Sequence, residues 1–154
     1  MLTQLILPIH PPDAHSFQNF YTGNNAILLN CLKSFSLKIG EPYVYIWGSS
    51  GAGCTHLLQA CCHAAQQQGF SVAYLPLNTL KKTNSAEIFR GLETVDMVCI
   101  DELESLVGDS IWQESLFHFY NRLQEQARYL LIAAKNSPNQ LNFSLPDLIS
   151  RLAS

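Results

Sequence analysis

The feature that most constrains the fold is a glycine-rich break between a short apolar run and a helical pattern. The apolar run, residues 43–47, is β-branched and aromatic and has the length of a strand. The helical pattern extends from Thr55 to about Gln68 and ends at Gly69. The connection reads Gly48, Ser49, Ser50, Gly51, Ala52, Gly53, Cys54, Thr55. A strand-to-helix turn of this composition is typical of a phosphate-binding loop.

The loop fits the pattern GxxxxGK[ST] at every defined position except the lysine, which is Cys54. Glycines let main-chain N–H groups face phosphate oxygens, and the helix start adds partial positive charge. Thr55 offers a hydroxyl for Mg²⁺. Losing the ammonium removes a charge-assisted bond worth about 1.5–3 kcal/mol, mostly at the outer phosphates. Two alternatives stay open: a glycine-rich turn that binds no ligand, and a redox-active Cys54 thiol activated by the helix start.

The rest of the chain alternates strands with helices. The apolar and β-branched runs predict further strands at residues 71–75, 96–101 and 129–134. Helices are expected from residue 26 toward 40, and at 86–92, 111–126 and 146–152. The strands are nearly continuous apolar runs, as in a parallel sheet covered on both faces. We therefore predict an α/β fold with a parallel sheet flanked by helices.

Two carboxylates end the strand at residues 96–101. They are Asp101 and the adjacent Glu102. In a nucleotide-hydrolysing enzyme with a phosphate loop, the first carboxylate holds Mg²⁺ and the second polarises the attacking water. The alternative is a solvated acidic turn, but the phosphate loop earlier in the chain favours the catalytic interpretation.

Length and composition bound the remaining possibilities. With 154 residues the chain has room for one ordinary domain, and 47% hydrophobic residues suffice for a core. Residues 1–23 hold three prolines and no helical period, which predicts an extended arm before a core at 24–154. The formal charge is −3, so the sequence lacks the overall positive charge that usually binds nucleic-acid phosphates. We therefore expect DNA contact to be at most indirect.

The cellular compartment of the protein is inferred from features that the sequence lacks. It has no long apolar run and no basic leader, which predicts a cytoplasmic protein without a membrane segment. The cysteines are odd in number and without CxxC spacing, which disfavours disulfides and zinc. Four of them are expected to be buried as small apolar residues: Cys31, Cys61, Cys62 and Cys99.

Taken together, these stretches resemble the DnaA-related AAA+ family, and most closely its Hda group of regulatory inactivators of DnaA. The matching segments are residues 4–9, 17–25, 51–58, 98–101, 119–122 and 139–152. The resemblance implies a P-loop NTPase (AAA+) sheet of order 5-1-4-3-2, with the fifth strand and the helical lid missing from this chain. Residues 43–47 would then form an open sheet edge, which we expect another chain, a second copy or further natural sequence to cover.

The resemblance also implies a ligand. Adenine nucleotide, ADP or ATP with Mg²⁺, would lie on residues 48–56, including His56. Thr55 and Asp101 would hold the metal through the nucleotide. The adenine would be flanked by Phe20, Tyr21 and Asn25.

Two partners follow from the same resemblance. The arm would bind the DNA polymerase sliding clamp through Gln4, Leu5, Leu7, Pro8 and Ile9, with the glutamine at the pocket rim and apolar side chains as anchors. Arg151 falls on the family's arginine-finger position, which acts in trans on the ATP of a neighbour, here DnaA. The alternatives are a plain tail and an ordinary surface arginine.

The leading functional hypothesis is a regulator that docks on the clamp and promotes hydrolysis of DnaA-bound ATP, which inhibits re-initiation of replication. One alternative is an autonomous AAA+ ATPase resembling helicase loaders, with Glu102 positioning water. Another is a nucleotide-free interaction module. The missing lysine at Cys54 argues against efficient hydrolysis by the chain alone. A further departure is Lys135, which stands where a polar sensor residue is expected, with Asn136 one place later.

Overall fold

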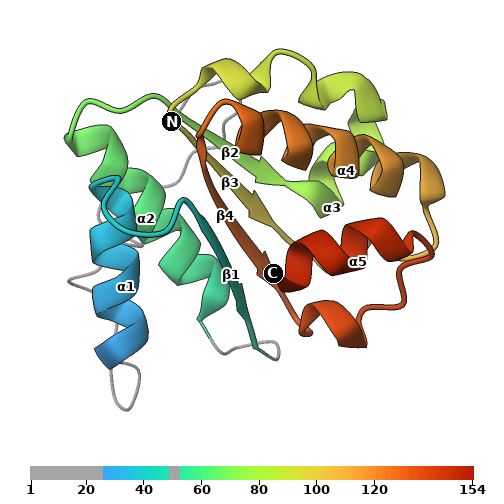
Figure 1. Cartoon of the computed structure of the whole chain (residues 1–154), viewed down its shortest axis with the longest axis horizontal. Helices are drawn as coiled ribbons and strands as arrows, with labels where there is room; N and C mark the ends of the chain where they lie inside the picture. Colours follow the sequence, from blue (N-terminus) through green and yellow to red (C-terminus); the bar gives the residue numbers. More distant parts are fainter. Residues whose placement is uncertain (1–25, 49–52) are drawn as a thin grey trace.

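The computed structural model of the chain describes residues 26–48 and 53–154 (Figure 1). It has three layers: a parallel sheet between helices α1 and α2 on one face and α4 and α5 on the other. The strands are β1 (Tyr43–Trp47), β2 (Val72–Pro76), β3 (Met97–Asp101) and β4 (Tyr129–Ala134). The helices are α1 (Ala26–Ser36), α2 (Cys54–Gln67), α3 (Leu77–Thr83), α4 (Ser110–Glu125) and α5 (Pro146–Ala153).

The strand order is β1-β4-β3-β2, with every pairing parallel. This confirms the predicted α/β class, and the four described strands follow the expected relative order. Two pairings set the register, Trp47 with Ala134 and Ile100 with Ile132. The carboxyl ends of β1, β4 and β3 therefore meet along one end of the sheet, where parallel α/β proteins hold their ligands.

Alternate residues of the strands fill two separate cores. On one face, Val98, Ile100 and Ile132 pack against α4, α5 and the short 3₁₀ turns. On the other face, Cys99 and Leu131 pack against α1 and α2. On α4, Trp112, Leu116, Phe119 and Leu123 are all buried in the first of these cores. A side chain period of two on a doubly covered sheet produces this division.

Polar contacts tie α4 to the segments that precede it and α5, and tie α5 to the sheet. The fully buried Gln113 donates to the Leu106 carbonyl (2.8 Å) and accepts from the Ser144 N–H (3.0 Å). The Tyr43 hydroxyl donates to the carbonyl of Leu152 (2.7 Å). A strand at the sheet edge is thereby tied to the last helix, which carries Arg151.

Two expectations about local structure are wrong, and one helix was not expected. Residues 86–92 form no single helix but two 3₁₀ turns, Ala86–Phe89 and Leu92–Thr94, separated by Gly91 at φ 86°. Helix α3 was not foreseen, because its seven residues start directly after Pro76 and bury only Leu77. Cys31 is exposed, whereas Cys61, Cys62 and Cys99 are buried as expected.

Strand β1 is at the edge of the described sheet, as the sequence predicts. Trp47 at its carboxyl end is 55% exposed. That another chain, a second copy or further sequence covers this edge stays a prediction.

Candidate functional site

The glycine-rich segment connects β1 to α2, as predicted. Gly48 leaves the strand with its N–H donating to the Ala134 carbonyl (3.2 Å). Gly53 precedes α2 at φ 90°, a left-handed conformation that disfavours any residue with a Cβ. The predicted phosphate contacts of Ser49, Ser50, Gly51 and Ala52 lie outside the described residues. The two described glycines lie directly after β1 and directly before α2, at the carboxyl end of the sheet.

The start of α2 suits an anion. Its first turn contains Cys54, Thr55 and His56 and carries no acidic residue. Gly53, at the cap position, contributes no side chain that could accept from the first N–H groups. Partial positive charge at this end therefore remains available to a phosphate.

Asp101 is buried at the end of β3 and held by a hydrogen-bond network. Its Oδ2 accepts from the Tyr74 hydroxyl (3.0 Å), and its Oδ1 accepts from the Glu102 N–H (2.9 Å). The Thr55 side chain also hydrogen-bonds to it. Burial raises the pKa of Asp101, while these hydrogen bonds act in the opposite direction. The structure thus brings together the hydroxyl and the carboxylate that the sequence nominates for Mg²⁺.

Those two groups fit the metal chemically. Mg²⁺ prefers hard oxygen ligands, and in nucleotide sites it takes one or two from protein and the rest from phosphates and water. Among the described residues there is no group of three or more His, Cys, Asp or Glu that could hold a metal ion. A nucleotide-borne metal needs no such group.

Glu102 follows Asp101 with a left-handed backbone at φ 61°, unusual for a residue with a side chain. Burial and the neighbouring charge of Asp101 raise the pKa of Glu102. A conformation of this kind stores strain and is often found at functional sites. Its role as the water-polarising group stays a prediction.

Cys54 has no support as an activated thiol. Burial raises its pKa, and the negative charges of Asp101 and Glu104 raise it further. A reactive thiol needs the opposite, an electropositive surrounding that lowers the pKa. Burial and the acidic edge therefore both act against the thiolate that the redox alternative requires.

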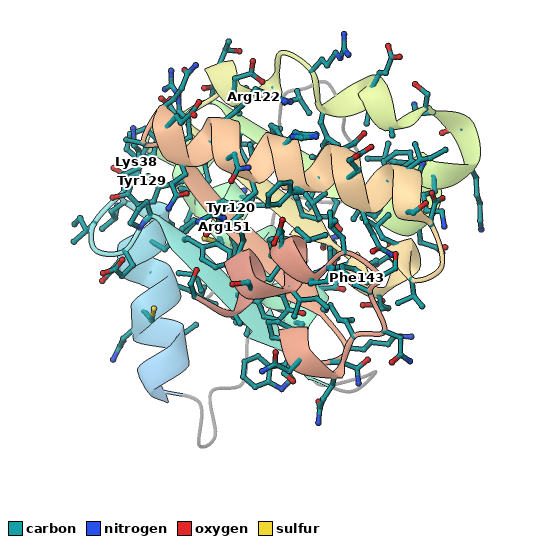
Figure 2. The ribbon with its side chains drawn as sticks, turned by 45° about the vertical axis from the view of Figure 1, so that its right-hand side comes forward. Lys38, Tyr120, Arg122, Tyr129, Phe143 and Arg151 are labelled. Carbon is teal, nitrogen blue, oxygen red and sulfur yellow. The ribbon has the colours of Figure 1, made fainter. Side chains whose placement is uncertain are left out.

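Arg151 is exposed on α5, one residue before the carbonyl that Tyr43 anchors (Figure 2). Within residues 26–48 and 53–154 its guanidinium makes no ion pair. Tyr43 begins β1, whereas Gly48 follows the end of that strand, so the arginine and the phosphate turn belong to different ends of β1. The Arg151 side chain is therefore exposed to solvent and is not packed into the core of its own domain.

Several residues of the site escaped the sequence analysis. Tyr74 holds Asp101 and accepts from the Gln59 amide (3.1 Å), and Glu104 Oε1 accepts from the Lys135 N–H (3.0 Å). A tyrosine among the aliphatic residues of β2 was the available signal for Tyr74. The predicted adenine-flanking Phe20, Tyr21 and Asn25 and the clamp-binding residues of the arm lie outside the described part of the chain.

A family model shows to which proteins this domain is related. The model for the bacterial DnaA ATPase domain matches residues 12–154. The chain belongs to the bacterial DnaA ATPase domain family. Its three-layered fold, with the glycine-rich turn and Asp101 at one end of the sheet, is therefore the fold of a DnaA-related AAA+ domain.

Solved structures agree with the assignment. AMPPCP-bound DnaA from Aquifex aeolicus is 28% identical with a TM-score of 0.78, over 91% of this chain and 48% of that one. Domain III of the Thermotoga maritima initiation protein DnaA is 25% identical with a TM-score of 0.78, over 95% of this chain and 65% of that one. The chain thus spans about half the length of the first and about two thirds of the second.

A more distant likeness shows the fold alone. The DnaC helicase loader is 16% identical with a TM-score of 0.64, over 92% of this chain and 89% of that one. Among the described residues, no helix is both long and apolar enough to cross a bilayer.

Proposed function

We propose that this DnaA-related domain binds an adenine nucleotide with Mg²⁺ at the turn between β1 and α2. The observation that carries the proposal is the meeting of Thr55 and Asp101 at the start of α2. The absence of acidic residues in that first turn supports it. So does the relative from Aquifex aeolicus, which is bound to AMPPCP, an ATP analogue. ADP is the resident nucleotide in this proposal, because Cys54 leaves the outer phosphates without the usual ammonium.

The domain then acts on a partner rather than on its own nucleotide. In this account Arg151 reaches in trans to ATP held by DnaA and stabilises the charge that develops during hydrolysis. Its exposure and its lack of an ion pair with described residues support this role. The anchored carbonyl of Leu152 supports it too, because a finger acts best from a rigid element.

The arm brings the regulator to the replication machinery. Gln4, Leu5, Leu7, Pro8 and Ile9 dock on the sliding clamp in this proposal, so that hydrolysis of DnaA-bound ATP follows replication and inhibits re-initiation. A second copy pairing with the open edge of β1 would place two domains side by side. DNA takes part at most indirectly.

The test is a single-turnover assay of ATP bound to DnaA, with clamp loaded on DNA. The full chain is expected to accelerate hydrolysis, and Arg151→Ala to lower that acceleration by about 10³-fold, because a finger arginine contributes 10³–10⁵ in rate. Arg90→Ala, at another exposed arginine, is the matched control. Equal acceleration by the Arg151→Ala variant and the unchanged chain would contradict the finger.

The alternative of an autonomous ATPase rests on Glu102. Its raised pKa and strained backbone beside Asp101 suit a group that handles a proton. Steady-state turnover by the purified chain, lost in Glu102→Gln, would favour this alternative over the regulator. The third possibility, an interaction module without nucleotide, requires that no ADP binds.

A further inference from the structure

A series of hydrogen bonds links the first two turns of α2 to strands β2 and β3. Asp101 accepts from the Tyr74 hydroxyl (3.0 Å), and the side chain of Thr55 is also hydrogen-bonded to it. The Tyr74 oxygen in turn accepts from the Gln59 amide (3.1 Å). Thr55 and Gln59 are four residues apart on α2, so they lie on one face of the helix, one turn apart. The series therefore begins and ends on the same face of the helix that follows the phosphate turn.

The Tyr74 hydroxyl has one proton, and its two neighbours determine where that proton points. A phenol stays protonated at neutral pH, and an ionised carboxylate such as that of Asp101 only accepts hydrogen bonds. The side-chain amide nitrogen of Gln59 only donates them. The Gln59 amide therefore donates to a lone pair of the Tyr74 oxygen and leaves the Tyr74 proton for Asp101.

The Asp101 carboxylate is held at both of its oxygens. Its Oδ2 accepts from Tyr74, whereas its Oδ1 accepts from the Glu102 N–H (2.9 Å). Tyr74 is only 6% exposed and Asp101 only 4% exposed. The pairing of Pro76 with Asp101 fixes the two strands relative to each other. Donors on both oxygens define the plane of the carboxylate, and such outer partners commonly orient the groups that bind a metal.

We propose that Tyr74 is a positioning residue for the Mg²⁺ of the bound nucleotide, because it fixes the Asp101 carboxylate beside the Thr55 hydroxyl. Gln59 assists by orienting the Tyr74 hydroxyl. Tyr74 touches neither metal nor nucleotide in this account and acts through Asp101 alone. The inference rests on the proposed nucleotide site and adds to it two residues outside the phosphate-loop motif. The competing explanation is that Tyr74 only satisfies buried polar groups and contributes to folding.

The test measures the affinity of the full chain for ADP by isothermal titration, with and without Mg²⁺. Tyr74→Phe keeps the buried ring and removes the hydroxyl. It is expected to weaken the binding of Mg-ADP by about 10-fold, the effect of losing a partner of a metal-binding group. Binding of ADP without Mg²⁺ should stay unchanged. In a titration with Mg²⁺ at saturating ADP, the half-saturating Mg²⁺ concentration should rise by about the same factor of 10.

Tyr129→Phe is the matched control. It removes a hydroxyl from another strand, where that hydroxyl donates to the Lys38 carbonyl (2.8 Å) at the opposite end of the sheet. Its affinities for ADP with and without Mg²⁺ should equal those of the unchanged chain. Melting temperatures of both variants show that a loss of binding is not a loss of folding.

A double-mutant cycle tests the part of Gln59. Gln59→Met removes the amide and should weaken Mg-ADP binding less than Tyr74→Phe, because the Tyr74 hydroxyl can still donate to Asp101. In the Tyr74→Phe background the same change should have no further effect on Mg-ADP binding, since Gln59 acts through the hydroxyl. An additive loss would overturn the part assigned to Gln59.

Two results would overturn the role of Tyr74. One is an unchanged response of the Tyr74→Phe variant to Mg²⁺, and the other is an equal weakening of ADP binding with and without the metal. Absence of ADP binding by the natural chain would instead remove the proposed function, and this inference with it.

Discussion

The two ends of the sheet treat carboxylate charge in opposite ways. At the amino end, Asp96 accepts from the Ser71 N–H (2.9 Å) and lies near Lys38 (3.7 Å) and Arg128 (3.8 Å). These contacts, led by the Ser71 N–H, lower the pKa of Asp96. At the carboxyl end, burial raises the pKa values of Asp101 and Glu102. One end uses its carboxylate for stability, while the other keeps its carboxylates in an unfavourable state that a bound Mg²⁺ would relieve.

Further contacts between side chains and neighbouring segments are found at the amino end of the sheet. The Tyr129 hydroxyl donates to the Lys38 carbonyl (2.8 Å), and the Lys38 ammonium lies over the Tyr129 ring, 5.8 Å from its centroid (Figure 2). The corresponding carboxyl end has an exposed Trp47 and a strained Glu102. Functional sites are commonly built at the expense of stability in this way.

The largest effect on stability is expected at the amino end. Asp96→Ala removes the acceptor for Ser71 and two partly exposed ion pairs, and should lower the free energy of unfolding by about 2 kcal/mol in urea at neutral pH. Because the pKa of Asp96 is lowered on folding, its contribution is complete above the ordinary aspartate value of 3.8. The difference between the two proteins should therefore shrink as pH falls below about 4.

Glu125→Ala, at an exposed carboxylate on α4 with no ion pair to described residues, is the control and should change stability by less than about 0.5 kcal/mol. An Asp96→Ala protein as stable as the control would mean that the amino end does not stabilise the domain.

A smaller effect of opposite sign is expected at the carboxyl end. Asp101→Asn removes a buried charge and should raise the free energy of unfolding by about 1 kcal/mol at neutral pH, while abolishing the dependence of nucleotide binding on Mg²⁺. Because folding raises the pKa of Asp101, the unchanged chain gains stability as pH falls from neutral through that raised value toward 3.8. The advantage of the variant should therefore fade over that range.

Asp147→Asn, at an exposed aspartate in the first turn of α5, serves as the control for the same chemical change. An Asp101→Asn protein less stable than the unchanged chain at neutral pH would show that the Tyr74 and Thr55 hydrogen bonds already compensate the buried charge, and the contrast between the two ends would fail.

The fold could be predicted from the sequence because each helix or strand is marked by a pattern of neighbouring residues. Each predicted element follows from a pattern within one segment, as the strand at 43–47, the helix after Gly53 and helix α4 illustrate. The site was accessible only where a motif marks it, at Thr55 and Asp101. Tyr74, Gln59 and Glu104 were missed because their roles depend on which strands are neighbours. Lys135 was noticed as a departure, but its place beside Gly48 required the pairing of β1 with β4.

The departures from expectation have two origins. The segment 86–92 has helical composition, yet Gly91 at φ 86° divides it into two short turns. For Cys54, burial first and the charges of Asp101 and Glu104 second raise the thiol pKa. A local glycine decided the first case, and the tertiary surroundings decided the second.

The central claim is that the turn between β1 and α2 holds a nucleotide with Mg²⁺ although Cys54 replaces the lysine. Isothermal titration of the full chain with ADP tests it most directly, with and without Mg²⁺. The account predicts saturable binding of one ADP per chain that tightens when Mg²⁺ is present. No saturable heat at millimolar ADP with Mg²⁺ would contradict it.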